Sequence, residues 1–346
     1  GPAARPRRRD AGRGQASVTR PVAAVCLVIP TWNGATMLRR CLQALDEQTW
    51  RPQQVIVVDN GSIDGTAEMV ATTWPDVEVL ALPANEGFAG GCNRGVAAAG
   101  AGLDVVLLNN DATPHPHWLE ALARANDEAA AAVGVLSAKI VSASGTIDSA
   151  GDFLTSWGMP FQRGHGEPDD GRYDVPGPIF SACGGASLYR RRMLDDVGVL
   201  DETFFAYYED VDLCFRARLA GWDVVYVPEA VVSHVGGGTS SRVTGFRRYH
   251  ATRNLWFLLL KNTPTPMLPL MLTRTAAVQC AWLLGAARHG ELGTALRAHQ
   301  DAARQLGAVL SARRSVQRRR VVPSGVVRSW LPRRRRDVSR PGPAGL

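Results

Sequence analysis

Two aspartates lie at or shortly after the ends of apolar runs whose composition predicts buried strands. Residues 105–108 are continuously apolar, as expected of a strand buried on both faces of a parallel sheet, and Asp111 follows them after two asparagines. Asp59 follows a second apolar run, 55–58. Ligands gather beyond the carboxyl ends of parallel strands, so Asp111 could hold a metal-bound phosphate and Asp59 could accept a hydrogen bond from the imide N–H of uracil or thymine. The alternative for each is a turn-forming aspartate.

The first predicted strand, 23–29, adds small polar groups to the same edge of the sheet. It is followed by Pro30-Thr31-Trp32-Asn33-Gly34. Three neighbouring strand ends that carry small polar side chains predict a bed for a nucleotide, to which Thr31 and Asn33 would contribute.

A glycine-rich segment, 87–95, indicates a pyrophosphate site. Its backbone N–H groups and Asn93 lie near the predicted start of an alanine-rich helix, where N–H groups attract anions. The segment does not match G-x-G-x-x-G, which would follow the first strand directly, and the chain contains no G-x-x-x-x-G-K-[ST] loop. Both absences argue against a dehydrogenase and an NTPase.

Three carboxylates, those of Glu209, Asp210 and Asp212, lie within four residues at a predicted helix start. A helix N-terminus stabilises negative charge, and Asp212 is spaced to pair with Arg216 one turn later. The preceding aromatic segment, 204–208, is expected to bury Glu209 and Asp210. A carboxylate so placed is a candidate general base.

His234 ends a short predicted strand, 231–234, and precedes three glycines. A lone histidine is more often a packed or surface residue. If Asp111 binds a metal, however, an imidazole from a second strand end could be a further ligand, because Mg²⁺ and Mn²⁺ take few protein groups beside phosphate oxygens and water.

Strands and helices alternate through the first part of the chain. Four β–α alternations within residues 23–131 predict an α/β fold, doubly wound around a mostly parallel sheet with helices on both faces. The expected organisation is a basic flexible segment (1–22), a catalytic domain (23–240) with a nucleotide-binding half (23–112) and an acceptor half (113–240), a helical extension (241–310) and an Arg-rich tail (311–346).

The net charge of +7 is unevenly spread over the 346 residues. Residues 1–20 carry +5 and residues 311–346 carry +10, which leaves the body mildly acidic. Such basic ends favour an anionic membrane surface; nucleic acid is not expected, because Trp330 is the one aromatic residue of the tail.

Six cysteines without a C-x-x-C pair predict reduced thiols of a cytosolic protein, and the Arg-, Pro- and Gly-rich N-terminus predicts no signal peptide.

Three apolar blocks follow in the C-terminal part, at 255–260, 267–272 and 278–284. Charged residues and prolines interrupt them, so no stretch approaches the ~20 apolar residues of a membrane-spanning helix. The blocks predict helices that either pack on the catalytic domain or lie on a membrane surface.

Taken together, these motifs resemble a family 2 glycosyltransferase of the GT-A fold, of the bacterial rhamnosyltransferase-like branch. The matching segments occur in family order over residues 24–235. They are 28–34, 57–62, 85–91, 107–111, 184–185, 209–213 and His234. The chain departs from the family's Asp-x-Asp motif, because Asn109 and Asn110 precede Asp111 and leave fewer charges for a metal.

The resemblance implies a role for each matching residue. Asp59 would contact the base and Asn33 the nucleoside. Asp111 and His234 would hold a divalent metal, Mg²⁺ or Mn²⁺, on the diphosphate, and Asp210 would be the catalytic base with Glu209 beside the acceptor. The implied donor site comprises Pro30, Thr31, Asn33, Asp59, Asn60, Gly61, Asn85, Gly87, Phe88, Asn93, Asn110 and Asp111.

The implied reaction is a single displacement with inversion at the anomeric carbon. Asp210 would take a proton from an acceptor hydroxyl, which attacks opposite the diphosphate through a transition state resembling an oxocarbenium ion. The branch resemblance implies dTDP-L-rhamnose as donor and a glycan or lipid-linked acceptor in cell-surface polysaccharide synthesis, with the enzyme cytoplasmic and peripheral on the inner face of the membrane.

Three alternatives stay open at this point. A UDP-sugar could be the donor. A nucleotidyltransferase making sugar nucleotides could share the fold, although it would show a Gly- and basic-rich loop after the first strand. A non-catalytic binding module would not need the Glu209–Asp210 pair. The oligomeric state is open as well.

Overall fold

The computed structural model describes residues 21–234, 243–333, 337 and 338. The expected N-terminal segment 1–22 lies almost wholly outside the described residues. So do the three glycines 236–238, the expected boundary at residue 240 and most of the tail beyond residue 333.

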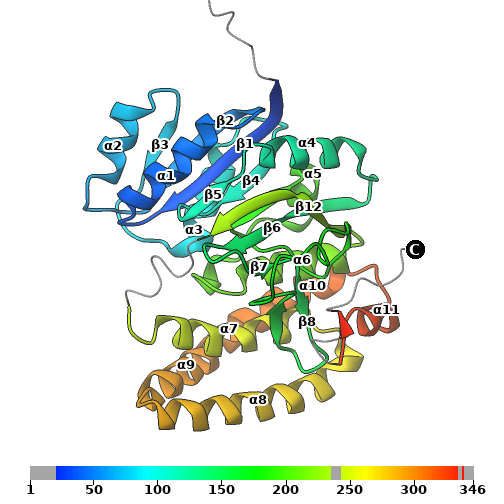
Figure 1. The fold of residues 1–346 in the computed structure, drawn as a ribbon. Coiled ribbons are helices and arrows are strands. Elements are labelled where there is room, and N and C mark those ends of the chain that lie inside the picture. Colours follow the sequence, from blue (N-terminus) through cyan, green and yellow to red (C-terminus); the bar gives the residue numbers. More distant parts are fainter. Residues whose placement is uncertain (1–20, 235–242, 334–336, 339–346) are drawn as a thin grey trace, which may run out of the picture.

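A central sheet organises the structure (Figure 1). Its strands are β1 Val22–Thr31, β2 Arg51–Asp59, β3 Glu78–Ala81, β4 Asp104–Leu108, β5 Ala112–Pro114, β6 Val133–Ser142, β7 Ile147–Ser149, β10 Gly177–Pro178, β11 Ala186–Tyr189 and β12 Asp223–His234. Eight of them follow the order β10-β12-β6-β11-β4-β1-β2-β3, while β5 pairs with β12 and β7 with β6. A separate hairpin joins β8 Asp152–Leu154 to β9 Pro160–Gln162.

The sheet is mostly parallel along its length. β3, β2, β1 and β4 are parallel neighbours, and β6 is parallel to β12. β11 lies antiparallel between β4 and β6. The short strand predicted at 231–234 is the end of the longer strand β12, which has a register shift between Val227 and Val231.

Helices cover both faces of this sheet. Those that alternate with the strands are α1 Ala35–Asp46, α2 Thr66–Thr73, α3 Gly87–Ala98, α4 Trp118–Glu128, α5 Arg191–Val197 and α6 Glu209–Leu219. A C-terminal layer follows, comprising α7 Phe246–Asn262, α8 Leu268–Arg288, α9 Leu292–Arg304, α10 Leu306–Arg319 and α11 Ser324–Ser329.

Alternate residues of the strands enter two separate cores. In β1, Cys26 and Val28 belong to the core beneath α3, α5 and α6. Leu27 and Ile29 point the other way, into the core beneath α1, α2 and α4. Each fully buried aliphatic side chain contributes about 1.5–3 kcal/mol. Burial on both faces explains the unbroken apolar runs and confirms the predicted doubly wound α/β fold.

The glycine-rich segment is itself the first part of α3, not a loop before a later helix. A Cβ at Gly95 would lie 2.2 Å from Cγ1 of Val28 and 3.1 Å from Cγ2 of Val58. The glycines therefore let α3 lie directly against β1 and β2, which is why a segment of low helix propensity is helical here.

The first apolar block of the C-terminal part packs on the catalytic domain. Leu255, Phe257 and Leu258 of α7 are buried in a third core that α6, α8, α10 and α11 also contribute to. Arg313 of α10 bonds to the C-terminal end of α7. Its Nη1 donates to the carbonyl oxygens of Leu260 (2.8 Å) and Thr263 (2.6 Å). The expected boundary at residue 310 therefore falls inside α10.

The expectation that the later apolar blocks are too interrupted to span a membrane is wrong on length and composition. Both blocks lie in one helical stretch, Thr265–Arg288, which is long and apolar enough to cross a membrane, and 22% of its apolar window is buried. Pro264, Pro266 and Pro269 do not break α8, because they precede it or lie in its first turn, where a missing N–H costs nothing.

Candidate active site

Polar side chains meet at the carboxyl ends of β1, β2 and β4. Thr31 lies opposite Asp59 in the register of β1 and β2, and both are buried. The Nδ2 group of Asn110, after β4, donates to Oγ1 of Thr31 over 2.8 Å. The structure thus brings together the predicted strand ends, with Pro30 just before Thr31 in β1.

The loops after β1 and β2 are tied to each other. Oδ1 of Asp59 accepts from the N–H of Ser62 (3.0 Å), as in the turn that was the alternative reading of this aspartate. Asn33 donates its N–H to Oγ of Ser62 (2.8 Å), and its Oδ1 accepts from the N–H of Ile63 (2.9 Å). Asn33 therefore holds the loop after β1 against the loop after β2.

Asn60 joins the same edge to the start of α3. Its Nδ2 donates to the carbonyl of Gly87 and its Oδ1 accepts from the N–H of Glu86, both over 2.8 Å. Oδ1 of Asn85 accepts from the N–H of Gly87 (2.8 Å). Gly61 has φ +77° and a Cβ there would lie 2.9 Å from the backbone of Ala84, so a glycine is needed for this close approach.

The prediction that Asn93 lies near a helix start is wrong. It lies two turns into α3, because the helix begins at Gly87. Its Nδ2 donates to the carbonyl of Leu200 (2.9 Å) and to Oε1 of Glu202 (3.0 Å), and its Oδ1 accepts from the N–H of Leu200 (3.1 Å). Asn93 anchors the chain segment before α6 and does not face the strand ends.

Asp111 and His234 lie side by side, as predicted. β5 pairs with β12 so that Ala112 lies opposite His234, and Oδ1 of Asp111 is 3.1 Å from Nε2 of His234. The other ring nitrogen, Nδ1, is 2.9 Å from Oδ2 of Asp148, a residue that sequence reasoning missed. Burial alone would lower the pKa of His234, but hydrogen bonds and charge from Asp111 and Asp148 outweigh it and raise the pKa to about 10.

This pair fits a hard divalent cation. Two ligand atoms at the edge of an octahedron with bonds of ~2.1 Å are about 3.0 Å apart, close to the separation of the Asp111 and His234 atoms. Asp148 fixes the ring by accepting a hydrogen bond from the nitrogen that would not face the cation. The two asparagines before Asp111 are less suited to be metal ligands, because the side chain of Asn110 is bonded to Thr31 and that of Asn109 packs against Gly185.

Glu209 and Asp210 begin α6 beside this edge. Oδ2 of Asp210 accepts from the N–H of Gly184 (2.9 Å), and a Cβ on Gly184 would lie 3.3 Å from the ring of Phe88 in α3. Burial raises the pKa of Glu209 well above its usual range, and the charge of Asp210 adds to this. Burial also raises the pKa of Asp210, against hydrogen bonds from Gly184 and Val211 that favour its ionised form.

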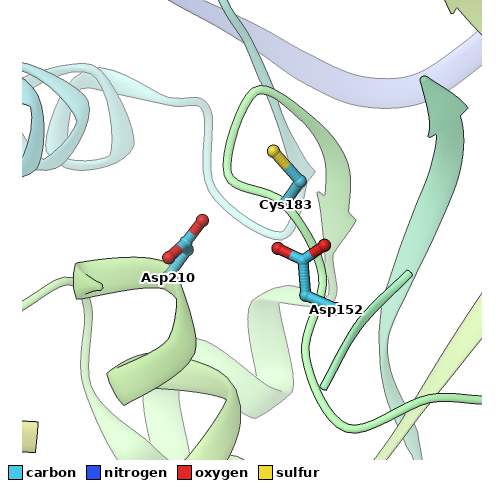
Figure 2. Close-up of side chains that lie close together, drawn as sticks. All are labelled: Asp152, Cys183 and Asp210. Atoms are coloured by element: carbon cyan, nitrogen blue, oxygen red, sulfur yellow. The ribbon is translucent and has the colours of Figure 1, made fainter. Parts of the chain in front are cut away.

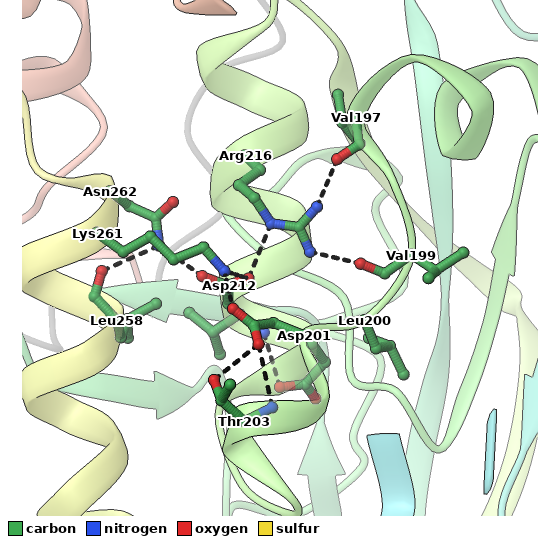
Figure 3. A network of polar contacts seen from close by, with 12 residues as sticks. Val197, Val199, Leu200, Asp201, Thr203, Asp212, Arg216, Leu258, Lys261 and Asn262 are labelled. Carbon is green, nitrogen blue, oxygen red and sulfur yellow. Dashed lines mark hydrogen bonds and ion pairs between the residues drawn. The ribbon is translucent and has the colours of Figure 1, made fainter. Parts of the chain in front are cut away.

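Asp212 is a structural residue, as predicted. Its Oδ2 accepts from Nε of Arg216 and from Nζ of Lys261, both over 2.8 Å, and its Oδ1 accepts from Nδ2 of Asn262 over 2.7 Å. Figure 3 shows how this fully buried carboxylate joins α6 to the end of α7.

A further acidic residue that sequence reasoning missed, Asp152, faces Asp210. Ligand atoms of Asp152, Cys183 and Asp210 lie within 4.8 Å of one another (Figure 2). Burial raises the pKa of Asp152 to about 8, and it raises that of Cys183 well above its usual range. Sulfur is a soft ligand, whereas Mg²⁺ and Mn²⁺ prefer oxygen, so this cluster suits a hard cation less well than the Asp111–His234 pair. Both missed aspartates lie in the irregular stretch 142–178, where no periodic pattern marks them.

Sequence comparison decides the family. The family model described as glycosyl transferase family 2 matches residues 26–198, half of the chain. The chain belongs to this family. It is therefore an inverting family 2 glycosyltransferase, as the motif resemblance implied.

Relatives of this glycosyltransferase include two from Mycobacterium tuberculosis. An N-acetylglucosaminyl-diphospho-decaprenol L-rhamnosyltransferase is 31% identical over 236 residues, which cover 60% of this chain and 75% of that protein. A pre-mycofactocin glycosyltransferase is 32% identical over 216 residues, which cover 61% of this chain and 42% of that protein.

Solved structures confirm the GT-A fold. Staphylococcus aureus TarS 1–349 in complex with UDP-GlcNAc superimposes with a TM-score of 0.55 at 17% identity, over 86% of this chain and 88% of that one. GalNAc-T7 with UDP, GalNAc and Mn²⁺ gives a TM-score of 0.50 at 15% identity, over 63% of this chain and 44% of that one. At these identities the likeness concerns the fold alone.

Proposed function

We propose that this glycosyltransferase moves L-rhamnose from dTDP-L-rhamnose to a hydroxyl of a lipid-linked glycan acceptor, in the synthesis of a cell-surface polysaccharide. The observation that carries the transfer itself is the position of Asp210. The loop 184–185 lies between the end of β4 and the start of α6, contacting Asn109 through Gly185 and Asp210 through Gly184. A half-buried carboxylate thus borders the edge where the donor would lie.

The donor would lie across the strand ends. Asp59 would contact the base and Asn33 the nucleoside, with Pro30, Thr31, Asn60, Gly61, Asn85, Gly87, Phe88 and Asn110 forming the surrounding bed. Asp111 and His234 would hold Mg²⁺ or Mn²⁺. That cation would stabilise the negative charge of the departing nucleoside diphosphate.

Asp210 would serve as general base. Its ionised carboxylate takes the proton of the acceptor hydroxyl, the hydroxyl oxygen forms a bond to the anomeric carbon, and the bond from that carbon to the diphosphate oxygen breaks. Burial raises the pKa of Glu209 well above its usual range, and in its protonated form Glu209 would donate a hydrogen bond to the acceptor.

The choice of donor and acceptor is supported by the L-rhamnosyltransferase relative, whose name states a decaprenol-linked substrate. A UDP-sugar is the second candidate, because Asp59 could accept equally from the imide of uracil. A panel of sugar nucleotides tests this: nucleoside diphosphate release is measured for each, with and without a lipid-linked N-acetylglucosamine acceptor. Acceptor-dependent release from a UDP-sugar alone would contradict the rhamnosyl assignment.

The contacts and exposed residues of α8 support a location at a membrane surface. Gln279 faces the domain and donates to the carbonyl of Thr252 (2.9 Å), and Arg274 donates to the carbonyl of Ser156 (2.8 Å). The opposite side of α8 exposes Leu270 and Leu284. A helix bonded to the domain on one side and apolar on the other is suited to lie in a membrane interface, with nearby arginines on anionic lipid at the inner face.

A further inference from the structure

The backbone immediately before Glu209 is strained. Of the four described non-glycine residues with positive φ, three lie here, namely Phe205 (64°), Tyr207 (70°) and Tyr208 (73°). Phe205 has ψ −59°, and the N–H of Ala206 donates to the carbonyl of Phe204 over 2.8 Å, which is a γ-turn of the rare, strained type. Such conformations persist only where the surroundings hold them.

The surroundings are supplied by α7, from the C-terminal layer. Nδ2 of Asn254 lies within hydrogen-bonding distance of three carbonyl oxygens of the strained turn. They belong to Phe204 (2.9 Å), Ala206 (2.8 Å) and Tyr207 (2.8 Å). Asn254 is fully buried, so no water competes for these contacts.

Arg253 reinforces the same contact. Its Nη2 donates to the carbonyls of Thr203 and Phe204, both over 2.9 Å, and its Nε donates to Oδ1 of Asn254 over 2.9 Å. One turn earlier in α7, the ring of His250 stacks on Phe205 with centroids 5.3 Å apart and planes at 11°. Every carbonyl from residue 203 to 207 except that of Phe205 thus has a partner in α7.

The carbonyl of Phe205 and the last residue of the turn, Tyr208, connect the turn to the helices of the candidate active site. The carbonyl of Phe205 accepts from the N–H of Ala89 in α3 (3.2 Å). Tyr208 is the residue before α6, and its carbonyl accepts from the N–H of Asp212 in the first turn of that helix (2.9 Å). The turn therefore sets where α6 begins, and with it the positions of Glu209 and Asp210.

We propose that Asn254 and Arg253 are positioning residues for catalysis, because they hold the strained 203–208 turn and so place Asp210 against the acceptor hydroxyl. The inference rests on the proposed role of Asp210 as base. It assigns part of the active site to a helix that lies outside the region matched by the family model, residues 26–198.

Donor binding should not depend on this contact. The start of α3 contacts the turn through Ala89, but it is also held by Asn60, which bonds to Glu86 and Gly87, and by Asn85. Loss of the α7 contact should therefore lower kcat and leave donor affinity nearly unchanged. General destabilisation of the fold would instead reduce both kcat and donor affinity.

The test compares Asn254→Ala with Gln279→Ala, a matched loss of a buried amide that bonds α8 to α7 and does not touch the turn. Transfer kinetics, donor titration and hydrogen exchange of the 203–212 peptide are measured on the full chain. For Asn254→Ala we expect kcat to fall about 10²-fold, donor Kd to stay within about threefold, and exchange of the peptide to rise about tenfold or more. Gln279→Ala should show none of these changes.

A second substitution separates positioning from packing. Glycine adopts positive φ without a Cβ clash, so adding Tyr207→Gly to Asn254→Ala should restore part of kcat, about fivefold. A kcat within about threefold of wild type in Asn254→Ala, or an equal loss in Gln279→Ala, would overturn the proposal.

Two further outcomes are informative. If Asn254→Ala does not fold, Arg253→Lys replaces it, and unchanged exchange of the 203–212 peptide in that variant would refute the clamp. If the wild type transfers sugar from no donor, the proposed function fails, while the exchange measurement still decides whether α7 holds the turn.

Discussion

At the scale of single residues, the site depends on two adjacent carboxyl groups having unequal surroundings. Asp210 accepts hydrogen bonds from the N–H groups of Gly184 and Val211. Oε2 of Glu209 is buried and has no hydrogen-bond partner among the described residues. Negative charge is therefore stabilised on Asp210 and a proton on Glu209, a division that is typical of acid and base pairs in active sites.

Replacing Asp210 should stop transfer and spare donor binding. Asp210→Asn removes the proton acceptor, so we expect kcat to fall about 10²–10⁴-fold with donor Kd nearly unchanged. Glu209→Gln is the matched control, because glutamine imitates the protonated carboxyl that the raised pKa of Glu209 favours; its loss should be about tenfold or less. A larger loss of kcat in Glu209→Gln than in Asp210→Asn would indicate that Glu209 is the base.

The same kinetic assay carries a pH signature of Asp210. Only its ionised form accepts a proton, and burial raises its pKa, so activity should be lost as pH falls through that raised pKa. The acid limb of kcat should then lie above the ordinary aspartate pKa of about 3.9.

Asp148 should control how well the Asp111–His234 pair holds a metal. Asp148→Asn removes the charge that orients the imidazole of His234, so Mn²⁺ affinity in the presence of nucleoside diphosphate should fall about 10–100-fold. Electron paramagnetic resonance of free Mn²⁺ measures this directly. Asp170→Asn, at an exposed carboxylate paired with Arg172, is the control and should leave Mn²⁺ affinity unchanged. Equal affinities of the two variants would remove Asp148 from the metal site.

At the scale of elements, strand ends were predictable and helix contacts were not. Asp59, Asp111 and His234 could be placed from sequence because each lies at or shortly after the end of an apolar run, and such ends meet at one edge of a sheet. The predicted position of Asn93 near a helix start was wrong because the glycines of the segment 87–95 suggested a loop. In the structure these glycines permit close contact between a helix and the sheet. Asn254 bonds to carbonyls 47 to 50 residues earlier in the chain, and no local pattern marks such a partner.

The close contact of α3 with the sheet makes Gly95 sensitive to added volume. Gly95→Ala should destabilise the fold by about 1–3 kcal/mol, because the new Cβ would overlap Val28 in a packed core. Gly285→Ala, in α8 with open space around it, is the matched control and should be neutral or stabilise by up to about 1 kcal/mol. Thermal unfolding of both variants checks this, and a Gly95→Ala protein as stable as wild type would contradict the packing.

At the scale of the whole molecule, the division into catalytic domain and appendage is less sharp than the sequence suggested. Periodicity located the sheet and its helices, but the basic C-terminal residues were expected to form a tail beyond residue 310. Arg313 instead bonds to the end of α7, and Arg319 bonds to the carbonyl of Asp196 in α5. Composition alone could not show this, because the same arginines suit a solvated tail or a helix bonded to a domain.

The exposed face of α8 should bind anionic membranes. Leu270→Glu combined with Leu284→Glu places charge on that face, so co-sedimentation with vesicles containing phosphatidylglycerol should fall about tenfold, since each leucine contributes over 1 kcal/mol when buried. Val175→Glu, an exposed valine of the catalytic domain, is the control. High salt should weaken binding of the wild type. Equal sedimentation of the double variant and the control would exclude α8 as the membrane-binding face.

The dependence of the strained turn on α7 has a consequence for the order of events during protein synthesis. The ribosome releases the chain from its N-terminus, so β1, β2 and β4 emerge before Glu209 and Asp210. Asn254 emerges later, followed at once by α8. If Asp210 is the base and α7 holds the turn, as proposed, a growing chain would be unable to transfer sugar until α7 has formed, so catalysis would begin only while the C-terminal layer is being completed.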